Sequence, residues 1–287
     1  GQPPERLPTP PGASAAPVLS PSGQRMVFIH SDGQTDGLFL WESGAGQVTA
    51  IATGAGFFMQ PAWQPDETAL AWVEWQHPHL PWTHSRLALA NLPGSASPRL
   101  SILRDEPDCS FQQPEFSPDG RWLACLRSAA DGDSLELLDL ASGHWQALTS
   151  GPGAVLCLPA WLQGQRSFAW APDSQSLVFT RYAQARAQLW QVSLANGETR
   201  PLPNGPFTWF HQPCASPDGR LACLASAADL PPRVLLIAGS NWEVIAEADP
   251  PPAPGQYPTP RPLDIPTVHT TFYPPVRPAA SPLPPAV

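Results

Sequence analysis

The stretch that decides the fold is SPDGRWLACL, residues 117–126. Pro118 presets the backbone for the first corner of a turn, and Asp119 and Gly120 tolerate the turn and left-handed geometry that follows. The apolar run after the turn is too short for a helix and too continuous for a strand with one face in water. It therefore predicts a turn that leads into a β-strand buried on both faces.

The same unit recurs four more times along the chain. The other copies are SPSGQRMVFI from Ser20, QPDETALAWV from Gln64, APDSQSLVFT from Ala171 and SPDGRLACLA from Ser216. Successive prolines of the five units are 44, 53, 54 and 45 residues apart. A repeat of this length is typical of one blade of a β-propeller, in which each blade is a four-stranded sheet.

The segments around each unit supply the remaining strands. Short entries such as QPEF at 113–116 lie upstream, and pairs of apolar segments joined by a Gly-containing hairpin turn lie downstream, as in SLELLDLASGHWQALT at 134–149. No segment has convincing helical periodicity. We therefore predict an all-β fold, a β-propeller of about five four-stranded blades over residues 1–249, with blade cores near 20–29, 64–73, 117–126, 171–180 and 216–225.

The N-terminal residues affect how the ring is expected to close. Residues 1–7 resemble the outer-strand segment 143–148, whereas the last blade already has an outer strand of its own at 241–246. We therefore expect an incomplete ring, a fragment that lacks blades before its N-terminus. In the alternative, residues 1–7 complete a five-blade ring and residues 241–246 are displaced.

The composition changes after Asp249, where the chain becomes rich in proline. We expect residues 250–287 to form a semi-rigid linker, because such a stretch cannot join the interior of a sheet. Within it, residues 267–275 have strand character and are expected to begin a following unit.

Composition and charge exclude several classes of function. All 15 basic residues are Arg, the net charge is -9, and a polyanion would be repelled, so nucleic acid is not an expected partner. The sequence contains no apolar run of 18 residues and no signal peptide, so neither a membrane partner nor secretion is expected. The five cysteines are odd in number and widely scattered, which favours a reducing, cytoplasmic location over a disulfide framework.

Three stretches carry a resemblance to a known family. They are LAWVEWQHPHLPW at 70–82, FQQPEFSPDG at 111–120 and TFYPP at 271–275. Together they resemble the propeller of bacterial prolyl oligopeptidase family serine peptidases of the acylaminoacyl-peptidase or dipeptidyl-aminopeptidase type, with TolB-like repeats. The resemblance implies an α/β-hydrolase domain in the same polypeptide directly after residues 271–275. It also implies a propeller that restricts access, so that only short peptides reach the active site.

The chain departs from this family in one large respect. It contains no Gly-x-Ser-x-Gly nucleophile elbow and no His-Gly-Gly run for an oxyanion hole. No residue is therefore assigned a catalytic role, no cofactor is expected, and the chain as given is expected to be inactive although the full-length protein would be a serine-type peptidase. Two alternatives stay open: a free-standing TolB-like propeller that acts as a scaffold for protein partners, and a propeller enzyme such as a lyase or glycosidase, whose convergent carboxylates or histidines the sequence does not show.

The loop after the second blade core supplies the candidate binding residues. The resemblance places this loop at the surface that faces the catalytic domain, so Trp75, His77 and Trp82 are candidates for substrate access or domain contact. Alternatively, both tryptophans only pack the loop against its blade. A metal site at His77, His79 and His84 is not expected, because their spacing fits neither a helical pair nor a paired-cysteine site.

Two repeated residue types have structural interpretations. The turn aspartates could suggest an array of carboxylates, but their regular spacing predicts that each side chain bonds to its own turn backbone. These residues are Asp66, Asp119, Asp173 and Asp218. Cys125 and Cys223 lie in apolar runs and are expected to be buried, unreactive thiols.

Overall fold

The computed structural model describes residues 7–44, 48–54, 56–92, 97–250, 257–258, 260–265 and 268–275. These residues form five consecutive four-stranded antiparallel sheets and a final two-stranded hairpin, as the sequence predicts for an all-β propeller of about five blades. No helix long and apolar enough to cross a membrane occurs in the described part of the chain.

Each sheet contains four strands that follow one another in the sequence. The first sheet comprises β1 (Ala13–Leu19), β2 (Arg25–Ser31), β3 (Asp36–Glu42) and β4 (Val48–Gly54), and the second comprises β5 (Gly56–Trp63), β6 (Ala69–Gln76), β7 (Arg86–Asn91) and β8 (Arg99–Arg104). The third comprises β9 (Ser110–Phe116), β10 (Trp122–Ala129), β11 (Gly132–Asp139) and β12 (Trp145–Thr149). The fourth comprises β13 (Phe168–Trp170), β14 (Ser176–Ala183), β15 (Arg186–Ser193) and β16 (Thr199–Pro201), and the fifth comprises β17 (Trp209–Ala215), β18 (Leu221–Ala227), β19 (Leu230–Ala238) and β20 (Asn241–Glu247).

The hydrophobic core lies between successive sheets. Four buried clusters join the first sheet to the second, the second to the third, the third to the fourth and the fourth to the fifth. Each predicted blade core supplies a turn and the second strand of its sheet, and these strands are buried on both faces. In β6, for example, Leu70 and Trp72 pack toward the first sheet while Ala71 and Val73 pack toward the third. Face-to-face packing of this kind sets the sheets side by side around a common concave side.

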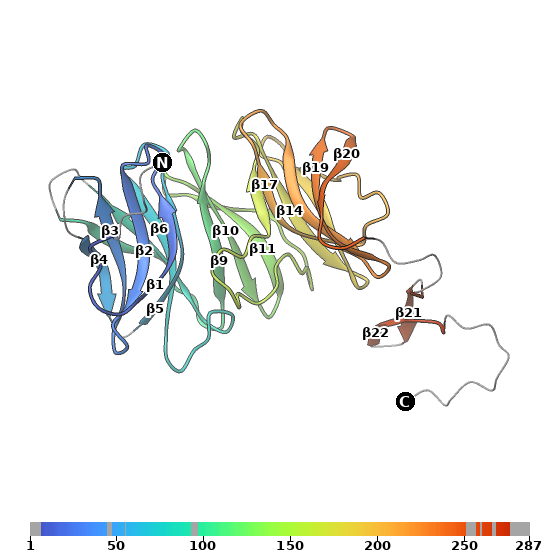
Figure 1. The fold of residues 1–287 in the computed structure, drawn as a ribbon, viewed down its shortest axis with the longest axis horizontal. Coiled ribbons are helices and arrows are strands. Elements are labelled where there is room, and N and C mark those ends of the chain that lie inside the picture. The colour runs from blue at the N-terminus through green and yellow to red at the C-terminus, as the bar shows by residue number, and fades with distance from the viewer. Residues whose placement is uncertain are drawn as a thin grey trace.

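The arrangement of the sheets is an open arc. Figure 1 shows the first sheet and the fifth sheet at opposite ends of the molecule, and no buried cluster of the described residues joins them. The incomplete ring is therefore what the described residues form. The alternative with a displaced outer strand is wrong, because Asn241–Glu247 is β20 and pairs with β19. The expected strand at 1–7 lies outside the described residues except for Leu7.

The five turns share a construction that matches the predicted role of their aspartates. Asp66, Asp119 and Asp173 each accept a hydrogen bond from the backbone N–H two residues later, at 3.0, 3.1 and 2.9 Å. Three of the turns carry Gly at a positive φ in the fourth position, whereas the second and fourth carry Glu67 and Ser174 at φ 61° and 59°. An L residue in this conformation is under strain unless its side chain is held by contacts.

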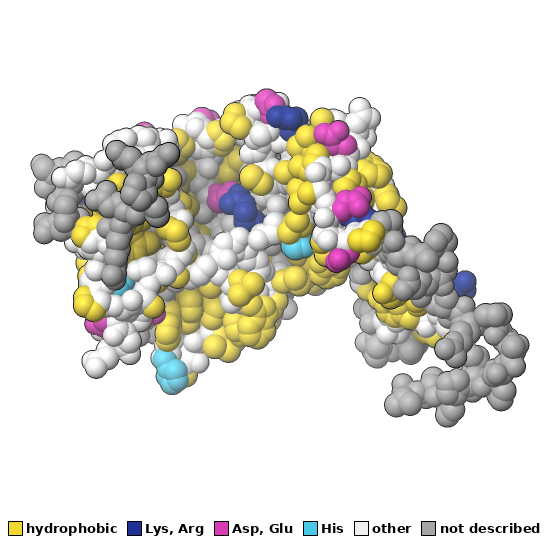
Figure 2. All heavy atoms as spheres, in the orientation of Figure 1, with side chains coloured by type: hydrophobic (Ala, Val, Ile, Leu, Met, Phe, Trp, Pro, Cys, Tyr) yellow, Lys and Arg dark blue, Asp and Glu magenta, His cyan; other side chains and the backbone are white. Residues whose placement is uncertain are grey.

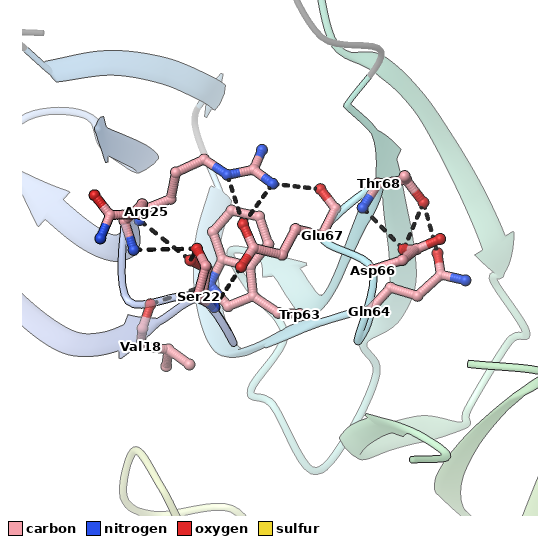
Figure 3. A network of polar contacts seen from close by, with 10 residues as sticks. Val18, Ser22, Arg25, Trp63, Gln64, Asp66, Glu67 and Thr68 are labelled. Atoms are coloured by element: carbon pink, nitrogen blue, oxygen red, sulfur yellow. Dashed lines mark hydrogen bonds and ion pairs between the residues drawn. The ribbon is translucent and has the colours of Figure 1, made fainter. Parts of the chain in front are cut away.

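Those contacts join neighbouring sheets. The Glu67 carboxylate accepts hydrogen bonds from the Ser22 backbone N–H at 2.5 Å and from the Arg25 guanidinium at 2.8 and 3.0 Å, as Figure 3 shows. The Ser174 hydroxyl likewise accepts a hydrogen bond from the Asp119 N–H at 3.0 Å. Side chains in place of glycine therefore tie the first sheet to the second and the third sheet to the fourth.

The C-terminal hairpin differs from the expected linker in one respect. The strand expected within 267–275 is present as β22 (Val268–Phe272), but it pairs antiparallel with β21 (Arg261–Ile265), which the sequence reading missed. Pro260 before β21 and Pro262 within it hid the strand, because proline cannot donate to a sheet ladder on its own side. A two-stranded ribbon has an outer edge on both sides, and this is where such prolines are tolerated.

Candidate functional site

One edge of the propeller gathers the longest connections. The loop of residues 77–85 joins β6 to β7, and residues 150–167, here called the central loop, join β12 to β13. In an antiparallel four-stranded sheet the connection between the second and third strands lies at the same edge as the end of the fourth strand. The end of β20 therefore lies at this edge as well, and we call it the exit edge because the chain leaves the propeller there.

The C-terminal hairpin lies against the same edge. Thr271 and Tyr273 line a pocket together with residues 184–186 and 226–230, which form the corresponding connections of the fourth and fifth sheets. In Figure 1 this edge points downward, toward the hairpin. The segment that follows the propeller thus remains on the side of the long loops.

An exposed aromatic pair occupies the exit edge. The rings of Trp82 and Trp161 lie 4.1 Å apart between centroids at an angle of 44°. Trp161 is 67% exposed and the adjacent Leu162 is 71% exposed. Leu80 and Leu158 add further exposed apolar surface from the same two loops. Figure 2 shows hydrophobic side chains gathered along this lower edge, beneath β9 and β11. We call Leu80, Trp82, Leu158, Trp161 and Leu162 the apolar patch.

The structure separates the three residues predicted for this loop. Trp82 belongs to the apolar patch, whereas Trp75 stacks on Phe57 with ring centroids 5.4 Å apart and packs against the core between the second and third sheets. His77 is exposed. The sequence reading missed Trp161, although its isolated position between Leu158 and Leu162 in a segment without strand alternation could have marked it as a surface residue.

The concave side of the arc is built from repeated X-Pro bulges. Ala16, Gln60, Gln113 and Gln212 each precede a proline in an innermost strand and have φ between 50° and 55°. The strand register shifts at each of these positions. A bulge frees the side chain and backbone of its residue from the ladder, so that they can bond elsewhere.

The central loop crosses this concave side. Gln163 donates from its amide to the Phe58 carbonyl at 3.0 Å, and Gln60 donates to the Gln165 carbonyl at 2.9 Å. Gln212 of β17 donates to the Gly164 carbonyl at 3.3 Å. The loop is thereby bonded to the innermost strands of the second and the fifth sheets, which lie on either side of it. It narrows the space that the innermost strands enclose.

An ion pair lies beside the central loop. The carboxylate of Glu115, on β9, contacts the guanidinium of Arg166, and the Glu115 side chain is 16% exposed. Burial raises the pKa of Glu115 above its ordinary value, while Arg166 and a hydrogen bond from Gln113 act in the opposite direction. A carboxyl group in this environment changes protonation closer to neutral pH than an ordinary glutamate does.

The other titratable groups indicate no reaction centre. All five cysteines are free, and burial raises the pKa of Cys125 and of Cys223, the latter to about 12, which confirms the prediction of unreactive thiols at these two positions. Among the described residues, no three His, Cys, Asp or Glu side chains come together as metal ligands would. His84 contacts Asp105 at 3.2 Å, and its ring lies 4.8 Å from that of His79.

Comparison with known proteins supports the fold and its association with peptidases. No family model matches the chain. A solved puromycin hydrolase superposes on 95% of this chain with a TM-score of 0.80 at 23% sequence identity, and a putative TolB from Agrobacterium tumefaciens superposes on 83% with a TM-score of 0.57 at 19% identity. In sequence, 97 residues are 29% identical to dipeptidyl-peptidase 5 of Porphyromonas gingivalis, over 32% of this chain.

The lengths of these proteins differ from that of the chain. The chain covers 44% of the puromycin hydrolase and 13% of dipeptidyl-peptidase 5, but the superposition covers 82% of the TolB protein. The fold is thus that of a propeller which occurs within larger peptidases and also in TolB proteins.

Proposed function

We propose that this chain is the non-catalytic propeller of a serine peptidase, and that it lies beside an α/β-hydrolase domain of the same polypeptide and admits only short peptides to the active site. The likeness to the puromycin hydrolase, of which the chain covers 44%, supports a larger protein of this kind. The absence of a nucleophile elbow from the sequence means that the catalytic residues belong to the other domain.

The central loop carries the access part of the proposal. It is bonded to β5 through Gln60 and to β17 through Gln212, so it lies across the concave side rather than along the rim. A folded protein cannot pass such an obstruction, whereas an extended peptide needs only the width of one chain. The filter is therefore steric and does not depend on the chemistry of the peptide.

The apolar patch is the surface that we assign to the contact with the hydrolase domain. It lies on the exit edge, where the chain leaves the propeller and where the hairpin of β21 and β22 also lies. Exposed tryptophan and leucine side chains that cluster in this way are typical of protein interfaces. Trp82 and Trp161 then make domain contact, and His77 lies at the margin of that surface.

The first experiment establishes whether a hydrolase is encoded in frame with this chain. Reading the gene beyond both ends is expected to reveal a Gly-x-Ser-x-Gly elbow followed by Asp and His. A stop codon directly after Val287 with no hydrolase gene beside it would contradict the proposal and favour the alternative, a TolB-like scaffold, for which the 82% coverage of the TolB protein is the supporting observation.

The second experiment tests the surface in the longer protein. Leu162→Ser is expected to weaken the domain contact and to raise kcat/KM for long peptides relative to short ones. Leu100→Ser is the matched control, because Leu100 is 54% exposed on the outer strand β8, away from the exit edge. Equal effects of the two substitutions on the ratio of long to short peptides would refute the assignment of the patch.

The location that we propose is cytoplasmic. All five cysteines are unpaired, and four of them are buried thiols. Proteins that use cysteine in this way belong to reducing compartments more often than to oxidising ones.

A further inference from the structure

A pocket of about 500 Å³ lies on the concave side, between the central loop and the innermost strands. Its size falls within the range of small-molecule sites. Ala16, Pro17, Ala62, Trp63 and Pro114 give it apolar walls. The pocket is on the opposite side of the central loop from the apolar patch, because its other walls are Leu19, Pro21 and Glu115 at the far ends of the innermost strands.

The walls of this pocket offer few hydrogen-bond donors to a ligand. Prolines at 17, 61 and 114 have no backbone N–H. The side-chain amide nitrogens of the lining glutamines already donate to carbonyl groups of the protein, at distances of 2.7 to 3.1 Å: Gln60, Gln113, Gln163 and Gln165. The indole N–H of Trp63 donates to the Val18 carbonyl at 3.1 Å.

Arg166 is the exception. Its Nε donates to the Pro213 carbonyl at 3.3 Å and its Nη2 contacts Glu115, whereas Nη1 has no hydrogen-bond partner among the described residues. The side chain is 37% exposed. Arg166 and Glu115 are also the two charged residues among those that line the pocket. The free donors of the site are therefore the N–H groups of a guanidinium, which match the two oxygens of a carboxylate.

We propose that this pocket binds a carboxylate attached to an apolar body, such as the C-terminal end of a short peptide, with the carboxylate on Arg166 and the apolar part against Trp63 and the prolines. Glu115 occupies one side of the guanidinium and opposes a second anion. Its burial favours the protonated form, so ligand binding is coupled to uptake of a proton by Glu115. The inference concerns this chain alone and does not depend on the proposed peptidase function.

The test is isothermal titration calorimetry on the 287-residue protein. The probes are acetyl-Ala-Pro-Ala with a free C-terminal carboxylate, the same peptide with an amidated C-terminus, and hexanoate. The free acid is expected to bind at least tenfold more tightly than the amide. Glu115→Gln is expected to tighten binding of the acid by at least threefold, because the competing negative charge is removed while an oxygen remains for the Gln113 amide.

Further variants separate binding from folding. Arg166→Gln by itself leaves Glu115 without its partner, so Arg166→Gln is made together with Glu115→Gln and is expected to abolish binding that Glu115→Gln alone retains. Arg220→Gln, at an exposed turn, is the matched control and is expected to leave binding unchanged.

Each outcome decides the proposal. Tight binding of hexanoate together with the peptide acid assigns the site to apolar carboxylates in general, and binding of the acid alone assigns it to peptide C-termini. Equal affinity for acid and amide, or no binding of any probe to the parent protein and to Glu115→Gln, would overturn it. Because no hydrolase domain takes part, this result is independent of the tests of the proposed function.

Discussion

Glu67 allows a sharp test of how the blades are held together. Its carboxylate joins the first two sheets through Ser22 and Arg25, as seen in Figure 3, and its side chain is 13% exposed. Burial opposes its charge, but the hydrogen bonds from Ser22 and Arg25 outweigh this effect and lower the pKa of Glu67 from 4.5 to about 2. We predict that Glu67→Gln destabilises the protein and that the loss depends on pH.

The size of the effect follows from the pKa shift. A depression from 4.5 to about 2 corresponds to ~3 kcal/mol as an upper bound. Because the turn lies at the surface, solvent screening reduces the expected loss to about 1–2 kcal/mol. A lowered pKa in the folded state contributes its full stability above pH 4.5, and this contribution disappears as the pH falls toward 2.

The assay is urea unfolding followed by tryptophan fluorescence, at pH 7 and at pH 3. The difference in free energy of unfolding between the parent protein and Glu67→Gln is expected to be about 1–2 kcal/mol at pH 7 and less than half of that at pH 3. A difference that is the same at both pH values would refute the electrostatic explanation. So would a variant as stable as the parent at pH 7.

A second pair of variants isolates the backbone at this position. Glu67→Ala and Glu67→Gly both remove the carboxylate, but only alanine retains a Cβ at φ 61°. Glu67→Gly is therefore expected to be about 1 kcal/mol more stable than Glu67→Ala. If the alanine variant is at least as stable as the glycine variant, the positive φ carries no strain.

Two other predictions concern the interior. Gln113→Ala is expected to cost about 2–4 kcal/mol in urea unfolding, because the side chain is buried and the backbone N–H groups of Ser167 and Phe168 lose their acceptor; Gln146→Ala, on the exposed strand β12, should change stability by less than about 0.5 kcal/mol. In native buffer a thiol reagent such as Ellman's reagent is expected to modify Cys214, which is exposed, and to leave the four buried cysteines unmodified until urea is added. Rapid release of more than one equivalent in native buffer would contradict the burial of those thiols.

Most of the fold could be predicted from the sequence because its signals are local. A turn built from Pro, Asp and Gly and a following apolar run act within about ten residues, and both recur in each blade. The predicted turn bonds of Asp66, Asp119 and Asp173 are present for the same reason. The strand β21 was missed because its prolines argue against a sheet wherever the sheet has inner positions.

The candidate site was predicted only in part. Trp82 was selected from its loop and lies in the apolar patch, but its partner Trp161 comes from a loop that joins two other strands of the chain. His77 and Trp75 were selected with it and lie elsewhere, because alternation along a strand and a turn of the chain separate neighbours in sequence. A contact between two distant loops has no local signature from which it could be read.

The sequence by itself determined the repeat, the strand order within each sheet and the exclusion of a catalytic elbow from this chain. Those properties depend on turn chemistry and on the alternation of residues along one segment. Only the tertiary structure decided that Gln60 and Gln212 hold the central loop across the concave side, and that Arg166 meets Glu115 there. These contacts join residues about 50 to 100 positions apart, and they form only after the packing of whole sheets has brought the innermost strands together.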